Sequence, residues 1–140
     1  MPVKKFFLLT NLIVLLFLSS LPESISQASP KDLPVLATIK ELLTEPNQYD
    51  SHRVVVAGRI RSMELQTGRR GGEFIMILLE EAAPNAAEPN PSIEVISLTI
   101  PKVRQGDRAL VQGIYHREGK QAGRPFEHFI DADAIIREKF

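Results

Sequence analysis

Basic side chains beside glycines are the residues of this chain whose types and spacing best suit ligand recognition. They are concentrated in two segments, residues 66–72 (QTGRRGG) and residues 118–125 (EGKQAGRP). An arginine guanidinium binds phosphate or carboxylate through paired hydrogen bonds, and glycine lets the backbone come close to a ligand. The segments therefore predict contacts with an anionic ligand, unless they are ordinary hairpin loops. The candidate ligand-binding residues are Arg59, Arg61, Arg69, Arg70, Lys120, Arg124 and Tyr115.

Two histidines offer a second kind of chemistry. His116 and His128 lie in segments expected to form antiparallel strands, across which they can face each other. Asp131 and Asp133 share one face of the second segment and can supply oxygen ligands. No ligand spacing typical of zinc or calcium accompanies them, and the simpler interpretation is two ordinary histidines and two solvated aspartates. We therefore expect no cofactor and no metal, with His116 and His128 as the candidate ligands if a metal is bound.

Catalytic motifs are absent from the sequence. It contains no HExxH, no nucleophile elbow and no phosphate loop, since QTGRRGG lacks the lysine and the Ser/Thr that end such a loop. The absence of cysteine excludes thiolate catalysis, disulfides and zinc-thiolate sites. We therefore expect no catalytic residues and a protein that is not an enzyme.

Length and charge set the scale of the folded part. A chain of 140 residues is typical of one domain with one core. Its 17 Lys and Arg residues balance its 17 Asp and Glu residues, so the net charge favours neither nucleic acid nor a membrane surface as partner. A binding function must therefore depend on local clusters of charge.

The N-terminal segment has the pattern of a secretory signal peptide. Lys4 and Lys5 precede an apolar run over residues 6–21, and Ser26 and Ala28 have the small-residue spacing of a cleavage site. We expect a signal peptide over 1–28, a tether over 29–37 that joins neither helix nor sheet, and one domain over 38–140. The protein is then periplasmic or secreted. An uncleaved segment anchored in the inner membrane is the alternative.

The remaining sequence predicts one short helix followed by strands. Thr38 and Glu41 have the spacing of a capping box, and Pro46 ends the helix that follows. Residues 81–92 are rich in Pro, Ala and Asn and predict a loop. Five segments with strand composition are bounded by turn residues, and they span residues 53–66, 73–81, 93–100, 107–118 and 126–140. Five strands in a small domain indicate a barrel or a sandwich.

The first of these strands changes face along its length. Val54, Val56 and Ile60 share one parity, whereas Met63 and Leu65 have the other. A bulge or bend is therefore expected, with Gly58 close to it. A long, bent strand of this kind allows a five-stranded sheet to close on itself.

The segments VVVAGRI and GDRALVQGIY, with a short helix before them and FIDADAI after them, resemble the OB-fold superfamily over residues 38–136. The resemblance is greatest to small exported, nucleic-acid-binding-like OB domains. It implies an all-β fold with a small α contribution: a five-stranded, closed or partly open Greek-key barrel preceded by a short N-terminal helix. One departure is the segment 101–106, which is too short for the helix that many OB folds have there.

The resemblance also implies where a ligand binds. OB folds use the face of strands two and three, flanked by the loop after strand one and the loop between strands four and five. In this sequence those loops are the two basic, glycine-rich segments. We therefore expect a non-catalytic binding module of the cell envelope for an anionic or oligomeric ligand, or for a protein partner.

Two alternatives remain open. Binding of single-stranded nucleic acid needs aromatic platforms, and only Phe74, Tyr115, Phe126 and Phe129 lie on or beside predicted strands. Some exported OB domains handle haem through a histidine near the C-terminus, so haem or metal handling through His116 and His128 is the second alternative. A membrane contact is expected only through residues 1–28, if that segment is uncleaved.

Overall fold

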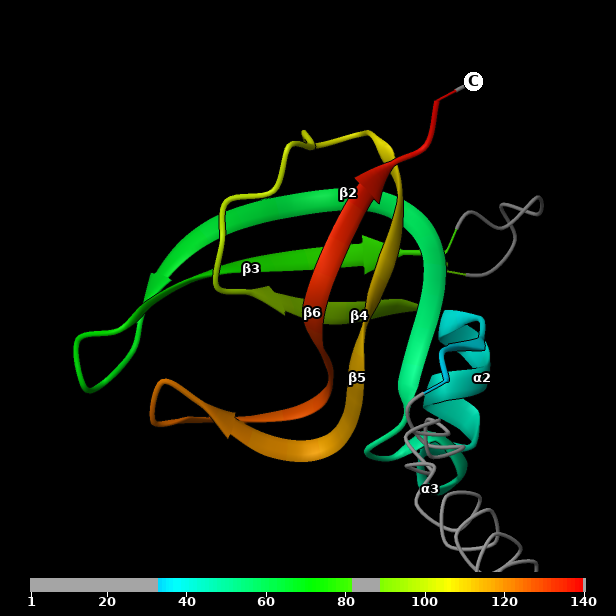
Figure 1. The fold of residues 1–140 in the computed structure, drawn as a ribbon, viewed down its shortest axis with the longest axis horizontal. Coiled ribbons are helices and arrows are strands. Elements are labelled where there is room, and N and C mark those ends of the chain that lie inside the picture. The colour runs from blue at the N-terminus through cyan, green and yellow to red at the C-terminus, as the bar shows by residue number, and fades with distance from the viewer. Residues whose placement is uncertain (1–32, 82–88, 140) are drawn as a thin grey trace, which may run out of the picture.

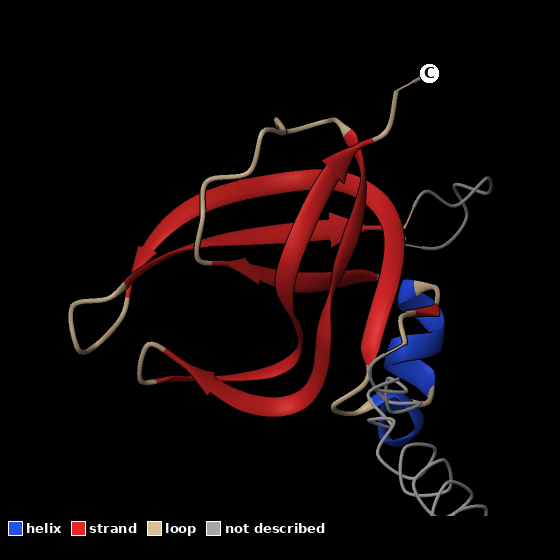
Figure 2. Ribbon diagram, in the orientation of Figure 1, coloured by secondary structure: helices blue, strands red, loops and turns tan. Residues whose placement is uncertain are grey.

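The computed structural model describes residues 33–81 and 89–139. Their elements are β1 (Val35–Leu36), α2 (Ile39–Thr44), α3 (Pro46–Tyr49), β2 (Arg53–Thr67), β3 (Glu73–Glu80), β4 (Ser92–Ser97), β5 (Arg108–Gln121) and β6 (Arg124–Arg137) (Figures 1 and 2). The predicted signal peptide lies outside the described residues. Within the described residues, no helix has the length and apolar character needed to span a membrane.

Five strands close into a ring. The order is β2-β3-β4-β6-β5, and β2 also pairs with β5, which completes the barrel. All neighbours are antiparallel except β4 and β6, which run parallel. Figure 2 shows the strands wrapped around a common interior, with both helices at one end. The expected all-β, five-stranded, OB-like barrel is therefore confirmed, and the link between β4 and β5 contains no helix.

Strand β2 belongs to both halves of the barrel. Residues from Arg53 to Arg59 pair with β5, and residues from Arg59 to Thr67 pair with β3. The expected change of face occurs at a register shift between Ile60 and Ser62, so the bulge is at Arg61 and not at Gly58. Gly58 has a different role, because a Cβ there would lie 2.7 Å from Leu79 Cγ. The missing side chain lets β2 and β3 approach each other.

The tether prediction was wrong for its last residues. Val35 and Leu36 pair in parallel with Val54 and Val55, and the amide of Ala37 donates to the carbonyl oxygen of Val55 at 3.1 Å. The edge of β2 is open at this point because β3 begins to pair only further along the strand. The prolines near residues 30–34 indicated a break in structure but could not exclude so short a pairing.

The second basic segment also differs from its prediction. Residues 118–125 do not form an open loop, because β5 continues to Gln121 and β6 begins at Arg124. Only Ala122 and Gly123 turn, with φ of 48° and 78°, as a tight two-residue hairpin requires. Gly119 and Pro125 weakened the strand pattern in the sequence, yet the ladder continues through both. Lys120 and Arg124 are therefore held on paired strands.

Helix α2 closes one end of the barrel. Thr38 Oγ1 accepts a hydrogen bond from the amide of Glu41 at 3.1 Å, and Glu41 Oε2 accepts one from the amide of Thr38 at 2.9 Å, so the predicted capping box is confirmed. The helix buries Ile39 and Leu42 completely. They join a barrel core that includes Val54, Val56, Ile60, Ile77, Leu79, Val95, Val111 and Ile130.

Thr38→Ala is expected to lower the free energy of unfolding by about 1 kcal/mol, because the amide of Glu41 loses its acceptor at the helix N-terminus. Urea denaturation followed by circular dichroism measures this loss. Thr44→Ala is the matched control, since it removes the same side chain from the far end of α2 and alanine favours the helix. Equal losses in the two variants would contradict a specific capping effect.

Candidate functional site

Two hairpin ends meet on one side of the barrel. The β2–β3 loop covers residues 68–72, and the β5–β6 turn consists of Ala122 and Gly123. The amide of Arg69 donates to the carbonyl oxygen of Ala122 at 3.2 Å. Figure 1 shows the green loop and the orange turn at the same side of the molecule. We call residues 66–72 and 120–124 together the hairpin rim, so the structure brings the two predicted basic segments into direct contact.

The contact requires glycine at one position. A Cβ on Gly68 would lie 2.3 Å from Ala122 Cβ and 2.5 Å from Ala122 O, which are impossible distances. At Gly72 a Cβ would lie 3.7 Å from Ala122 Cβ, which is ordinary contact. Gly68 therefore controls whether the two hairpins stay together, whereas Gly72 does not.

Arginine also connects the two hairpins. Nη1 of Arg124, on β6, donates to Oε1 of Gln66, on β2, at 2.9 Å. Its guanidinium carbon lies 5.7 Å from the centre of the Phe126 ring, where a cation is attracted to the ring face. These two contacts fix the orientation of the Arg124 side chain at the junction of the hairpins.

The other cations of the rim, Arg69, Arg70 and Lys120, are exposed. The side chains of Arg69 and Arg70 are close to the second hairpin, because a Cβ on Gly123 would lie 3.8 Å from an atom of each. Glu73 and Glu118, also exposed, lie at the bases of the two hairpins. The rim therefore offers one oriented arginine, Arg124, beside three exposed cations, with two carboxylates next to it.

A small aromatic cluster supports the rim from below. Phe74 and Phe129 are 1% and 2% exposed and pack with Ile96, with Met76, Ala122 and Phe126 around them. The ring centres of Phe74 and Phe126 are 5.9 Å apart in an edge-to-face arrangement, and those of Phe126 and Phe129 are 5.8 Å apart. Phe74 and Phe129 are thus structural, and only Phe126 in this cluster offers part of its ring to a ligand.

Arg59 and Arg61 lie away from the rim. Arg59 pairs with Glu80 on one side and with Arg108 on the other, in the middle of β2. At about 3.3 Å per residue along a strand, Arg61 is roughly 20 Å from Gly68. The structure therefore places these two arginines near the start of β5. They are close to the first loop in the sequence, but they do not belong to the rim.

Tyr115 lies in the core. It is completely buried, and its hydroxyl donates to the carbonyl oxygen of Leu42 at 3.1 Å. His128 Nδ1 lies 2.9 Å from the hydroxyl oxygen of Tyr115. Burial raises the pKa of this hydroxyl above its ordinary value of 10.0. Its parity matches that of buried Val111 on the same strand, a signal that could have identified it as a core residue.

The two histidines do not converge. The ring of His116 stacks on Phe129 with centres 5.1 Å apart, whereas His128 bonds to Tyr115, whose side chain is on the opposite face of β5. Asp133 forms an ion pair with Arg53. Among residues 33–81 and 89–139, no group of three or more His, Asp or Glu side chains is arranged to hold a metal ion.

Known proteins add little to this description. No protein-family model matches the chain, and no curated protein matches it. A solved structure from Leishmania major Friedlin, of a protein named as an aspartyl-tRNA synthetase, matches 91% of this chain with a TM-score of 0.46 and 10% identity. The match covers 26% of that protein, so this chain spans about a quarter of its length. At this similarity the match carries no argument, and the barrel is assigned from its strand order.

Proposed function

We propose that this chain is an exported, non-catalytic, OB-like binding module of the cell envelope, and that its hairpin rim binds an anionic oligomeric ligand. The observation that carries the proposal is the direct contact between the two hairpins, which unites Arg69, Arg70 and Arg124 on one surface. Export is inferred from the signal-peptide pattern of residues 1–28.

The chemistry of the rim favours an oligomer over a small anion. Its cations come from two hairpins that touch, and Arg69, Arg70 and Lys120 are exposed. A ligand with repeated negative groups can contact several of them at once, and each charge-assisted hydrogen bond adds to the affinity. A single phosphate would reach only one or two of these side chains.

An acidic polysaccharide fits the rim better than single-stranded nucleic acid. Sequence-independent binding of single strands depends on aromatic faces on which bases stack. Phe74 and Phe129 are buried beneath the rim, and Arg124 is already placed over Phe126. The rim therefore offers arginine donors without a row of stacking platforms.

Changing Arg69, Arg70 and Arg124 together to Ala is expected to weaken binding of heparin, used as an acidic polysaccharide probe, by at least about 100-fold, because three charge-assisted contacts are lost. Isothermal titration calorimetry of the full chain at low salt measures the affinity, and an oligothymidylate titration provides the comparison. Binding should also weaken as salt rises, since the contacts are exposed. Tighter binding of oligothymidylate than of heparin would favour the nucleic-acid alternative.

Gly68→Ala tests the hairpin contact without changing charge. Its Cβ would collide with Ala122, so the hairpins must separate and the affinity for heparin is expected to fall about 10-fold. Gly72→Ala is the matched control and should bind as the unaltered chain does, because its Cβ makes only ordinary contact. If neither polyanion binds, or if Gly68→Ala and the triple arginine variant both bind normally, the proposal is wrong.

A further inference from the structure

Three exposed arginines outside the hairpin rim have no partner for their charge. Among residues 33–81 and 89–139, the side chains of Arg59, Arg61 and Arg104 form no ion pair and no hydrogen bond. We call these three residues the arginine surface. An exposed guanidinium without a partner keeps all its N–H donors available to a carboxylate, sulfate or phosphate group.

The turn before β5 brings Arg104 next to β2. The amide of Asp107 donates to the carbonyl oxygen of Arg104 at 3.1 Å, and Gly106 has a φ of 91° within this turn. Two backbone hydrogen bonds then join the turn to β2. The amide of Gly106 donates to the carbonyl oxygen of Ile60 at 2.7 Å, and the amide of Ile60 donates to that of Asp107 at 2.9 Å. Since Ile60 lies between the two arginines of β2, all three arginines come from adjacent segments.

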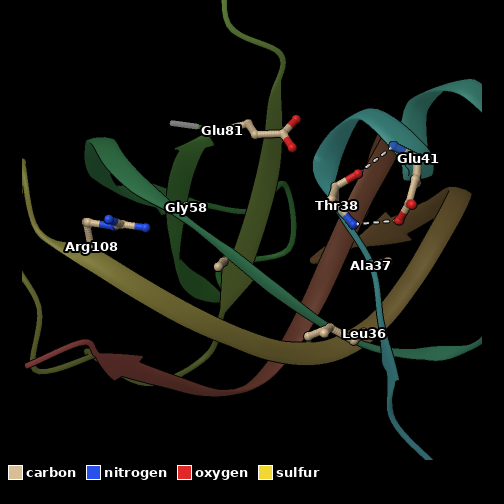
Figure 3. Close-up of a pocket in the computed structure, with 8 residues that line it drawn as sticks. Leu36, Ala37, Thr38, Glu41, Gly58, Glu81 and Arg108 are labelled. Carbon is tan, nitrogen blue, oxygen red and sulfur yellow. Dashed lines mark hydrogen bonds between the residues drawn. The ribbon is translucent and has the colours of Figure 1, made fainter. Parts of the chain in front are cut away.

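The nearest arginine of β5 does not belong to this surface. Arg108 is opposite Arg59 in the sheet, but its Nε lies 3.4 Å from Glu138 Oε2. It also lines a cavity of about 430 Å³ together with Glu41 and Glu81 (Figure 3). The charge of Arg108 is therefore balanced by carboxylates.

The other nearby acids leave the arginine surface cationic. Asp107 Oδ2 lies 3.5 Å from Arg137 Nε, so its charge is already balanced. Glu80 is opposite Arg59 on β3, and its Oε1 accepts a hydrogen bond from Asn90 at 3.0 Å. One carboxylate is thus left beside three arginines without partners. Cations on adjacent segments repel one another, and a bound anion relieves that repulsion.

The bulge at Arg61 puts this surface and the rim on the same face of β2. Side chains alternate between the two faces of a regular strand, so Arg59 and Gln66 would point to opposite sides without the bulge. The register shift reverses the alternation. Ile60 before the shift and Met63 after it both pack in the core. Arg59 and Gln66, the first residue of the rim, therefore both lie on the outer face.

A short length of β2 separates the arginine surface from the rim. At about 3.3 Å per residue, Arg61 is roughly 16 Å from Gln66. Gln66 Oε1 accepts a hydrogen bond from Arg124 of the rim at 2.9 Å. Between these ends the outer face of β2 carries Ser62 and Glu64, and Glu64 is the one acidic residue of the strand. A linear ligand laid along β2 therefore reaches both groups of arginines.

We infer that one acidic polysaccharide chain binds the arginine surface and the rim at the same time. The inference rests on the proposed function of the rim and adds a second subsite to it. At that subsite, Arg59, Arg61 and Arg104 donate paired hydrogen bonds to carboxylate or sulfate groups. Once one end of the chain is bound, the second contact is intramolecular, which raises the affinity. The ligand must therefore be long enough to span this part of β2.

Heparin fragments of two lengths test this requirement. A dodecasaccharide is long enough to reach both groups of arginines, whereas a disaccharide is not. Each is titrated into the isotope-labelled full chain and followed by amide chemical shifts in NMR spectra. The dodecasaccharide should shift amides of residues 59–61 and 104–106 together with those of the rim. The rim shifts should saturate at a concentration at least about 10-fold higher with the disaccharide.

Changing Arg59, Arg61 and Arg104 together to Ala separates the two contacts. The affinity for the dodecasaccharide, measured by isothermal titration calorimetry at low salt, should fall at least about 10-fold. The rim shifts caused by the disaccharide should saturate at an unchanged concentration. Arg61→Ala alone should weaken dodecasaccharide binding about 3-fold. Lys40→Ala is its control, because it removes an exposed cation of α2, and it should bind normally.

The outcomes separate this inference from the function proposed for the rim. Rim shifts without shifts at residues 59–61, or normal dodecasaccharide affinity in the triple variant, would overturn the inference and leave the proposed function standing. Absence of rim shifts with both fragments would instead contradict the proposed function, and the inference with it.

Discussion

Gly113→Ala is expected to lower the free energy of unfolding by about 3 kcal/mol or more. A Cβ at this position would lie 2.2 Å from the carbonyl oxygen of Asp131 and 2.8 Å from Ala132 Cα. Both obstacles are backbone atoms of β6, so no side-chain rotation can relieve the collision. The close approach occurs where the pairing of β5 with β6 shifts register, between Gln112 and Gly113.

Urea denaturation of the Gly113→Ala chain measures the loss. Gly72→Ala is the control, because its added Cβ makes only ordinary contact with Ala122 and its free energy of unfolding should change by less than about 0.5 kcal/mol. Similar stabilities for the two variants would mean that β5 and β6 tolerate a wider separation than the structure has. The closed barrel would then depend less on this crossing than its geometry indicates.

The elements of the barrel could be predicted because their patterns are local. Alternating apolar residues identified the strands to within a few residues, and the spacing of Thr38 and Glu41 identified α2 with its cap. The placement of the two basic segments at one side of the barrel followed from the resemblance to OB folds. For the strands and the helix cap, the relevant information is carried by neighbouring residues.

Features that depend on contacts between distant segments could not be predicted in this way. The bulge at Arg61 is fixed by where β2 changes partner from β5 to β3. That change also leaves Arg59 and Arg61 beside Arg108, far from the rim.

The position of Tyr115 depends both on a local sequence pattern and on a contact with a distant segment. Its parity in β5 predicts burial, but its polar hydroxyl and its position near a basic segment also suited a ligand contact. The structure gives the hydroxyl an acceptor at Leu42, in the helix that closes the barrel. The side chain therefore links α2 to β5 at a point where water is excluded, and an unpaired carbonyl there would be costly.

Tyr115→Ala is accordingly expected to lower the free energy of unfolding by about 3–5 kcal/mol, through loss of a large buried ring. Tyr115→Phe keeps the ring and should lose about 1–2 kcal/mol, because the Leu42 carbonyl is left without its donor. Urea denaturation measures both. Since the ring is buried away from the rim, Tyr115→Phe should bind heparin with unchanged affinity. A loss of affinity with stability intact would instead make Tyr115 a ligand contact.

The pH dependence of stability gives a second measure of the same hydroxyl. Burial raises its pKa in the folded chain, so the unfolded chain releases the proton first as the pH rises past about 10. The stability that the neutral hydroxyl contributes is complete below that pH and is lost as the pH rises through the folded pKa. The unaltered chain should therefore lose more stability between neutral pH and about pH 10.5 than Tyr115→Phe does. Equal losses would mean that the hydroxyl is hydrated in the folded state.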